Sequence, residues 1–317
     1  ARVGVGIGEA GGSPPSHSII SDIFPAEKRA GAIGFYSTGI NIGILFGFLA
    51  GGWLNEFFGW RVAFMVVGIP GILLAILVRL TIAEPVRGLA ENRKASDETA
   101  PFGAVLRLLW DRKSFRFMAL GAGLNAFAGY SSANWTASFM IRSHGMSTGE
   151  LGTWLAVIMG VFGAIGVFYG GVIADRLAPK DKRWYMWIPA IACFLSAPFL
   201  AGAYLAGGPY TALLLSFIPG LCFNVYVGNT IASTHGLVGL RMRATSSAIL
   251  FFILNMVGLG LGPWSVGLLS DYLEPTLGTE SLRHAMLYLL PAATVLSGLL
   301  FIFAARHLRE DLARAPD

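Results

Sequence analysis

Long apolar stretches alternate with short polar segments along the whole chain. With a window of about 19 residues, this hydropathy pattern predicts nine membrane-spanning helices. They lie near residues 1–23, 31–55, 61–82, 114–140, 147–174, 184–206, 209–236, 244–270 and 283–306. Each stretch is long enough for a helix to cross a hydrocarbon core of about 30 Å. The pattern therefore predicts an all-α, multi-pass membrane protein.

Arg2 and Glu9 are the formal charges that this pattern places deepest in a predicted span. On a helix, a separation of seven residues is about two turns and roughly 10.5 Å along one face. A charge at mid-membrane costs roughly 2.5 to 3.5 kcal/mol on insertion scales, so such a face needs water or polar partners. The pair indicates either a substrate or proton site, or a structural ion pair within a helix bundle.

The distribution of positive charge predicts the orientation. Most of the 23 Lys and Arg residues fall in alternate loops, whereas the opposite loops hold Arg61, Arg142 and Arg283. Because cytoplasmic loops retain positive charge during insertion, the basic loops are predicted to be cytoplasmic. Hydrophobic residues make up 55% of the chain, charged residues 13%, and the mean hydropathy is +0.64. The net charge of +5 is explained by this topology, so we expect no nucleic-acid partner.

The longest polar segment divides the predicted spans into two groups. Residues 83–113 are predicted to form a cytoplasmic linker, with three spans before it and six after it. Residues 1–82 are then the remainder of an N-terminal helical bundle, residues 114–308 a six-helix C-terminal bundle, and residues 309–317 a cytoplasmic tail. If the two bundles are equal, three helices are missing ahead of residue 1.

A weak internal repeat supports two related bundles. Asn41 follows the pair Arg29-Ala30 by twelve residues, and Asn255 follows Arg243-Ala244 at the same offset. Glycine-rich segments come after both asparagines. Internal symmetry of this kind is typical of two-bundle transporters.

Several amides interrupt the other predicted spans: Asn125, Asn134, Asn224 and Asn229. An amide inside hydrocarbon must find a partner, so these side chains are expected to face the interior of the bundle. They either contact a substrate or bond one helix to another. Cys193 and Cys222 lie within apolar spans, which suggests neither a disulfide nor a metal site. We find no catalytic triad, metal-ligand spacing or phosphate loop, so we expect no cofactor and no enzymatic activity.

Residues of the first two spans match a known pattern. They are Arg2, Gly4, Gly6, Gly8-Glu9-Ala10, Pro14, Ile20-Ser21-Asp22-Ile23-Phe24-Pro25 and Arg29. This pattern resembles the fourth and fifth helices of the major facilitator superfamily and, more narrowly, of its spinster-like branch. The resemblance implies a twelve-helix fold of which helices 4 to 12 are present. It also implies that Arg2 and Glu9 line a central cavity and serve ligand binding and proton coupling.

Two further segments resemble motifs of the same superfamily. Gly171, Asp175 and Arg176 resemble its cytoplasmic gating signature, in which the aspartate would meet a helix N-terminus and nearby arginines. The alternative is a plain solvated loop. The glycines at 39, 43, 47 and 51 leave one helix face bare, which indicates either close helix packing or a role in exchange transport.

Taken together, these features predict a secondary active transporter that works by alternating access and is coupled to protons. The resemblance to the spinster-like branch implies that it moves a lysolipid or sphingoid type of anionic amphiphile. Two alternatives stay open: a proton-coupled permease for a small organic anion or sugar acid, and a transport-inactive receptor or scaffold. The expected surroundings are the lipid bilayer of a bacterial inner membrane, with the protein as a monomer.

Overall fold

The computed structural model describes residues 16, 26–81, 101–239 and 242–315, and the elements that it describes there are all helices. These helices cover eight of the nine predicted spans, so the all-α prediction is confirmed for this part of the chain. The span predicted at residues 1–23 lies outside the described residues.

Two helices come first among the elements that the structure describes. Helix α3 (Ala26–Phe58) and helix α4 (Trp60–Thr81) are joined at Gly59, whose φ of +80° suits the tight turn between them. Apart from Ala63, the residues of α4 are at least partly exposed, and Phe64 and Leu80 are 74% and 79% exposed. So large an apolar surface is typical of a helix that faces lipid or another protein surface.

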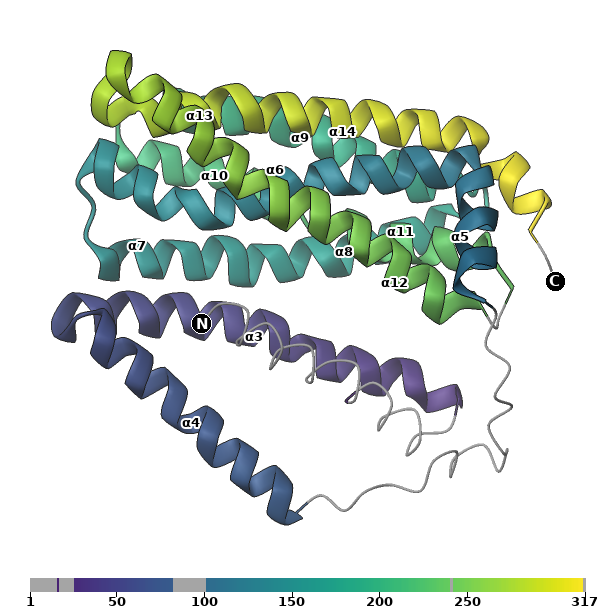
Figure 1. The fold of residues 1–317 in the computed structure, drawn as a ribbon, viewed down its shortest axis with the longest axis horizontal. Coiled ribbons are helices and arrows are strands. Elements are labelled where there is room, and N and C mark those ends of the chain that lie inside the picture. The colour runs from purple at the N-terminus through teal and green to yellow at the C-terminus, as the bar shows by residue number, and fades with distance from the viewer. Residues whose placement is uncertain (1–15, 17–25, 82–100, 240–241, 316–317) are drawn as a thin grey trace.

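The remaining passes form a six-pass bundle, in which α14 packs along both α6 and α9 (Figure 1). Three of the passes are continuous or nearly so, and three change geometry partway. The elements are α6 (Lys113–His144), α7 (Thr148–Leu155), η1 (Ala156–Phe162), α8 (Gly163–Leu177), α9 (Trp184–Leu205), α10 (Pro209–Cys222), α11 (Tyr226–Gly236), α12 (Arg243–Leu254), η3 (Asn255–Leu261), α13 (Gly262–Leu277), η4 (Gly278–Glu280) and α14 (Ser281–Ala313).

The changes of geometry fall at the middle of their passes. Segments η1 and η3 are π-helical, and a turn at residues 223–225 separates α10 from α11. Single π-helical turns within α-helices are frequent at functional sites. In a membrane, the backbone groups that such breaks release must be satisfied by neighbouring helices.

The linker predicted at residues 83–113 contains a helix that the hydropathy pattern did not predict. Helix α5 (Phe102–Asp111) is amphipathic and buries Val105 and Leu109 completely against the bundle. It packs on α12 and α6. The second half of the predicted linker is therefore part of the packed C-terminal bundle.

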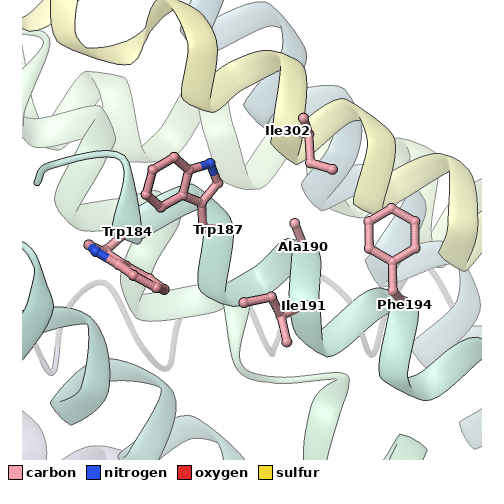
Figure 2. Close-up of a pocket in the computed structure, with 6 residues that line it drawn as sticks. All are labelled: Trp184, Trp187, Ala190, Ile191, Phe194 and Ile302. Atoms are coloured by element: carbon pink, nitrogen blue, oxygen red, sulfur yellow. The ribbon is translucent and has the colours of Figure 1, made fainter.

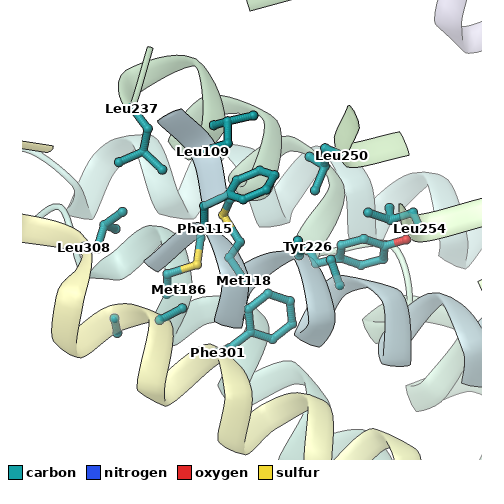
Figure 3. Close-up of a cluster of buried hydrophobic side chains, with 14 of the residues drawn as sticks. Leu109, Phe115, Met118, Met186, Tyr226, Leu237, Leu250, Leu254, Phe301 and Leu308 are labelled. Atoms are coloured by element: carbon teal, nitrogen blue, oxygen red, sulfur yellow. The ribbon is translucent and has the colours of Figure 1, made fainter. Parts of the chain in front are cut away.

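Buried apolar side chains hold the bundle together at both ends. At the predicted cytoplasmic end, one cluster joins α5, α6, α9, α12 and α14 (Figure 3). Its fully buried members include Phe115, Met118, Met186 and Phe301. A second cluster at the opposite end includes Phe139, Leu151 and Met286. The described part of the bundle is thus a rigid support for any side chain that it carries.

Within the part of the chain that the structure describes, five helical stretches are long and apolar enough to cross a membrane, judged by length and composition. They are Trp60–Thr81, Thr148–Leu177, Trp184–Leu205, Pro209–Gly236 and Arg243–Ala313. The last stretch contains two passes, α12 to α13 and then α14, which pack on one another.

Candidate functional site

Three of the predicted site residues cannot be placed from their side chains. Arg2 and Glu9 lie outside the described residues. Asn41 lies within α3, but its side chain is also outside the description. The expected cavity residues of the first bundle therefore stay predictions.

Asn125 of α6 bonds one helix to others. Its side chain is 3% exposed, and its Nδ2 donates a hydrogen bond of 3.0 Å to the carbonyl oxygen of Phe223, at the break between α10 and α11. Its Oδ1 accepts from the Cys193 thiol of α9 at 3.7 Å. The same thiol lies 3.5 Å from the Ser297 hydroxyl of α14. Asn125 therefore satisfies backbone that the helix break releases, as expected for a structural amide.

Three other amides bond to their own helices. Asn134, Asn229 and Asn255 each donate to the carbonyl oxygen four residues earlier, at distances of 2.8 to 3.0 Å. Asn229 is buried, and its Oδ1 has no hydrogen-bond partner among the described residues. Asn134 and Asn255 are exposed. Asn224 lies at the break after α10, with its Nδ2 beside Gly163 of α8.

The gating residues lie near the end of α8. Asp175 accepts a hydrogen bond of 3.1 Å from the hydroxyl of Tyr185 on α9, and Arg176 is exposed beside it. A methyl group at Gly171 would meet no described atom within 4 Å. Among the described side chains, Asp175 pairs with a tyrosine, whereas the sequence suggested arginines as its partners.

The carboxylate that binds arginines in this loop is Asp181, which the sequence analysis did not single out. Asp181 bonds to Arg183 at 2.9 Å and to Arg309 of α14 at 2.8 Å, and it accepts from the Arg183 amide at 3.0 Å. The hydrogen bond from the Arg183 side chain is the main reason that the pKa of Asp181 falls to about 2. One local signal was present, because this acid stands alone in the run Lys180-Asp181-Lys182-Arg183.

A junction between α3 and α7 joins the two parts of the chain at the end predicted to face away from the cytoplasm (Figure 1). A methyl group on Gly152 would lie 2.5 Å from the carbonyl oxygen of Phe48 and 2.9 Å from Cα of Gly52, so the two backbones touch. No described residue lies within 4 Å of a methyl group built on Gly39, Gly43, Gly47 or Gly51. The close approach therefore occurs at Gly52, one position beyond the predicted glycine ladder.

Polar side chains reinforce this junction. Glu56 Oε2 accepts hydrogen bonds from the Gly149 amide at 2.7 Å and from the Thr148 hydroxyl at 3.2 Å. Asn55 Nδ2 donates to Thr148 Oγ1 at 3.2 Å, and Trp53 Nε1 donates to Thr153 Oγ1 at 3.0 Å. A carboxylate at the N-terminus of a helix satisfies unpaired amides and interacts favourably with the helix dipole. Glu56 thereby ties the end of α3 to the start of α7.

A cavity of about 260 Å³ lies beside the junction, between α3, α6 and α7. Its walls include Gly47 and Gly51 of α3, together with Ala137 and Ile141 of α6. Asn134 precedes these α6 residues by three and seven positions, so it lies on the same helix face. Of the predicted amides whose side chains are described, Asn134 is the one that shares a helix face with this cavity.

Comparisons with known proteins agree on one family. Residues 1–263 match the family model of the Major Facilitator Superfamily. The chain is 32% identical to an MFS-type efflux pump of Mycolicibacterium smegmatis, over 98% of this chain and 71% of the pump. It is 24% identical to a sphingosine-1-phosphate transporter of Danio rerio, over 99% of this chain and 66% of that protein.

Among solved structures, the chain resembles a bacterial homologue of the human lysosomal transporter Spinster, in an inward-facing and unoccupied conformation. The TM-score is 0.77 and the identity 29%, over 98% of this chain and 76% of that one. This chain spans about two thirds or less of the length of several spinster relatives, for example 63% of the mouse spinster homologue 1.

Proposed function

Because the chain belongs to the major facilitator superfamily and to its spinster-like branch, we propose that this membrane transporter works by proton-coupled alternating access and moves an anionic amphiphile. The amphiphile is of the lysolipid or sphingoid type. One observation carries the alternating-access part: among the described residues, α3 contacts the second bundle through α7 and η1, over the half of the membrane predicted to face away from the cytoplasm.

This one-ended contact supports a state that is open to the cytoplasm. From the junction at Gly52, the contact extends as far as Leu45, whose Cα lies 3.0 Å from a methyl group built on Gly160 of η1. Nearer the predicted cytoplasmic end, Gly39 and Gly43 are exposed. The similar solved structure is described as inward-facing, which agrees with this state.

In an outward-open state, the α3–α7 junction must separate. Separation breaks the hydrogen bonds of Glu56 with Thr148 and Gly149, and that of Trp53 with Thr153. Water that enters between the helices then solvates these groups. The cost of breaking the junction sets how strongly the inward-open state is favoured, and substrate binding must supply the difference.

Arg2 and Glu9 are the proposed coupling pair. Desolvation favours neutral Glu9, whereas a nearby Arg2 favours the carboxylate. An anionic substrate that occupies Arg2 would remove its influence on Glu9 and make protonation easier. Coupling of this kind links two ligands by roughly 1 to 3 kcal/mol.

The amphiphile is the proposed substrate class for two reasons. The relative from Danio rerio is named as a transporter of sphingosine-1-phosphate, which carries a phosphate and a long apolar chain. In addition, the cavity beside the junction has walls of Gly, Ala, Leu and Ile with Asn55 and Thr148 at one side. Such walls suit an apolar chain.

Transport by the intact protein in proteoliposomes tests the proposal. The assay compares uptake of a lysophospholipid, sphingosine-1-phosphate and galacturonate, each with and without an inward proton gradient. We expect gradient-driven uptake of an amphiphile but not of galacturonate. Uptake of galacturonate alone would instead identify a small-anion permease, and substrate binding without uptake would identify a receptor.

The variant Glu9→Gln tests the coupling. It should abolish gradient-driven uptake but leave counterflow exchange of the amphiphile measurable, because exchange needs no net proton movement. Gradient-driven uptake at the full rate in this variant would show that Glu9 carries no proton.

A further inference from the structure

A groove of about 230 Å³ runs along the outer surface of α9 and α14, away from the α3–α7 junction (Figure 2). Its wall on α9 consists of Trp184, Trp187, Ala190, Ile191 and Phe194, and Ile302 of α14 completes it. Ile191 and Phe194 are 56% and 36% exposed. An exposed apolar groove of this kind is typical of a surface that contacts lipid or another protein.

The groove has the depth of one lipid leaflet. Trp184 is the first residue of α9, at the predicted cytoplasmic end, and Phe194 follows ten residues later. Ten residues of helix rise about 15 Å, which is half of a hydrocarbon core of about 30 Å. Trp184 and Trp187 lie at the shallow end, where tryptophans are enriched in membrane proteins. The groove therefore runs from the cytoplasmic interface toward mid-membrane.

Two arginines are held at the mouth of the groove. The guanidinium of Arg183 stacks over the ring of Trp187, 4.6 Å from its centroid, and bonds to Asp181. Arg309 binds the same carboxylate from α14, and it follows Ile302 by seven residues on one helix face. The side chains of Arg183 and Arg309 remain 35% and 57% exposed.

The charge around the mouth is positive. Asp181 is the single carboxylate in the loop of residues 178–183, which also contains Lys180, Lys182 and Arg183. A guanidinium has five N–H donors, so an arginine that binds Asp181 keeps donors free for a second anion. Arginines in such a fixed position suit a phosphate group well.

We propose that this groove binds one phospholipid with a net negative headgroup from the cytoplasmic leaflet. An acyl chain lies along α9 between Trp187 and Phe194, and the phosphate lies at Arg183 and Arg309. Basic sites between helices on the cytoplasmic side of membrane proteins select anionic lipids in this way. The lipid is a resident of the groove, distinct from the transported amphiphile, and it ties α14 to the start of α9.

Native mass spectrometry tests the proposal on the intact protein, reconstituted with equal amounts of phosphatidylglycerol and phosphatidylcholine. Wild type should retain one phosphatidylglycerol in preference to phosphatidylcholine. The double variant Arg183→Gln/Arg309→Gln should retain it about 25-fold less, because each surface arginine contributes a factor of about five. The matched control Arg79→Gln/Arg107→Gln removes two exposed cations predicted to be cytoplasmic and should behave as wild type.

A second variant keeps the test independent of the Asp181 ion pairs. Ile191→Trp fills the groove at an exposed position and should lower retention of both lipids without loss of folding. Equal retention of the two lipids by wild type would overturn the proposal. So would a loss in the control as large as in the double variant, unchanged retention in both groove variants, or displacement of phosphatidylglycerol by sphingosine-1-phosphate.

Discussion

The backbone amide of Gly149 at the start of α7 donates a hydrogen bond of 2.7 Å to Glu56 at the end of α3, 93 residues away in the chain. This contact connects the two parts of the protein that must separate in an alternating-access cycle. Its donor is an amide of the first helical turn, which has no partner within its own helix. Glu56 thus supplies a hydrogen-bond acceptor for this α7 amide only while the two helices remain in contact.

Replacing Glu56 should shift the protein toward its outward-open state. Glu56 accepts two of the hydrogen bonds that hold the junction, so Glu56→Ala should raise the outward-open fraction severalfold. Distances between spin labels at Phe58 and Leu205, both exposed, measure this ratio. Glu56→Gln retains an acceptor and should have a smaller effect.

Glu150→Gln is the matched control for this experiment. Glu150 is an acid of the same junction region, in the first turn of α7, but it accepts from the Tyr210 hydroxyl of α10 within its own bundle. The Glu150→Gln variant should show the same distances between the spin labels as wild type. Identical distances for wild type and Glu56→Ala would rule out a role for Glu56 in holding the junction.

Adding a side chain at Gly152 should force α3 and α7 apart. The methyl group of Gly152→Ala would lie 2.5 Å from a backbone oxygen, which cannot move without moving α3. Overpacking of this kind typically costs 1 to 3 kcal/mol, so uptake should fall by about tenfold. Gly228→Ala in α11, where no described atom lies within 4 Å, should have no such effect. Normal uptake by Gly152→Ala would mean that the junction is not tightly packed during the cycle.

Asp181→Asn should lower thermal stability at neutral pH by about 1 kcal/mol, because it weakens the bonds to Arg183 and Arg309. The pKa of Asp181 is about 2 in the folded protein and about 3.9 in an unfolded chain. The contribution of ionised Asp181 to the free energy of unfolding is therefore complete above pH 4 and is lost as the pH falls toward 2. Melting curves of both proteins should converge over that interval. A difference that stays constant down to pH 2 would contradict ionisation of Asp181 as its source.

Asn125→Ala and Asn134→Ala should separate a structural amide from a candidate substrate contact. Loss of the Asn125 side chain leaves the Phe223 carbonyl without this donor and should cost about 1 to 3 kcal/mol of stability. Its apparent KM for the amphiphile should stay unchanged. Asn134 is exposed and, among the described residues, bonds to its own helix, so Asn134→Ala should leave the melting temperature unchanged and raise KM. A lower melting temperature for Asn134→Ala, together with a raised KM for Asn125→Ala, would make Asn134 the structural amide and Asn125 the substrate contact.

The predicted spans and the family followed from the sequence because both depend on local information. A run of apolar residues commits a segment to the membrane, and the Lys and Arg residues beside it orient that segment, whatever its neighbours are. Helix α5 was missed for the same reason. Its ten amphipathic residues include an arginine and are too few and too polar for a membrane span, so the hydropathy pattern did not predict it. A helix this short is stabilised by packing against the bundle.

The sequence by itself also identified amides that need partners, but it left open which partners they have. The tertiary structure decided that Asn125 bonds Phe223, that Asp181 binds Arg309 across 128 residues, and that α3 meets α7 at Gly52. These contacts join segments far apart in the chain. Their existence depends on how whole helices pack. The hydropathy of one helix does not tell which face of a second helix will lie against the first.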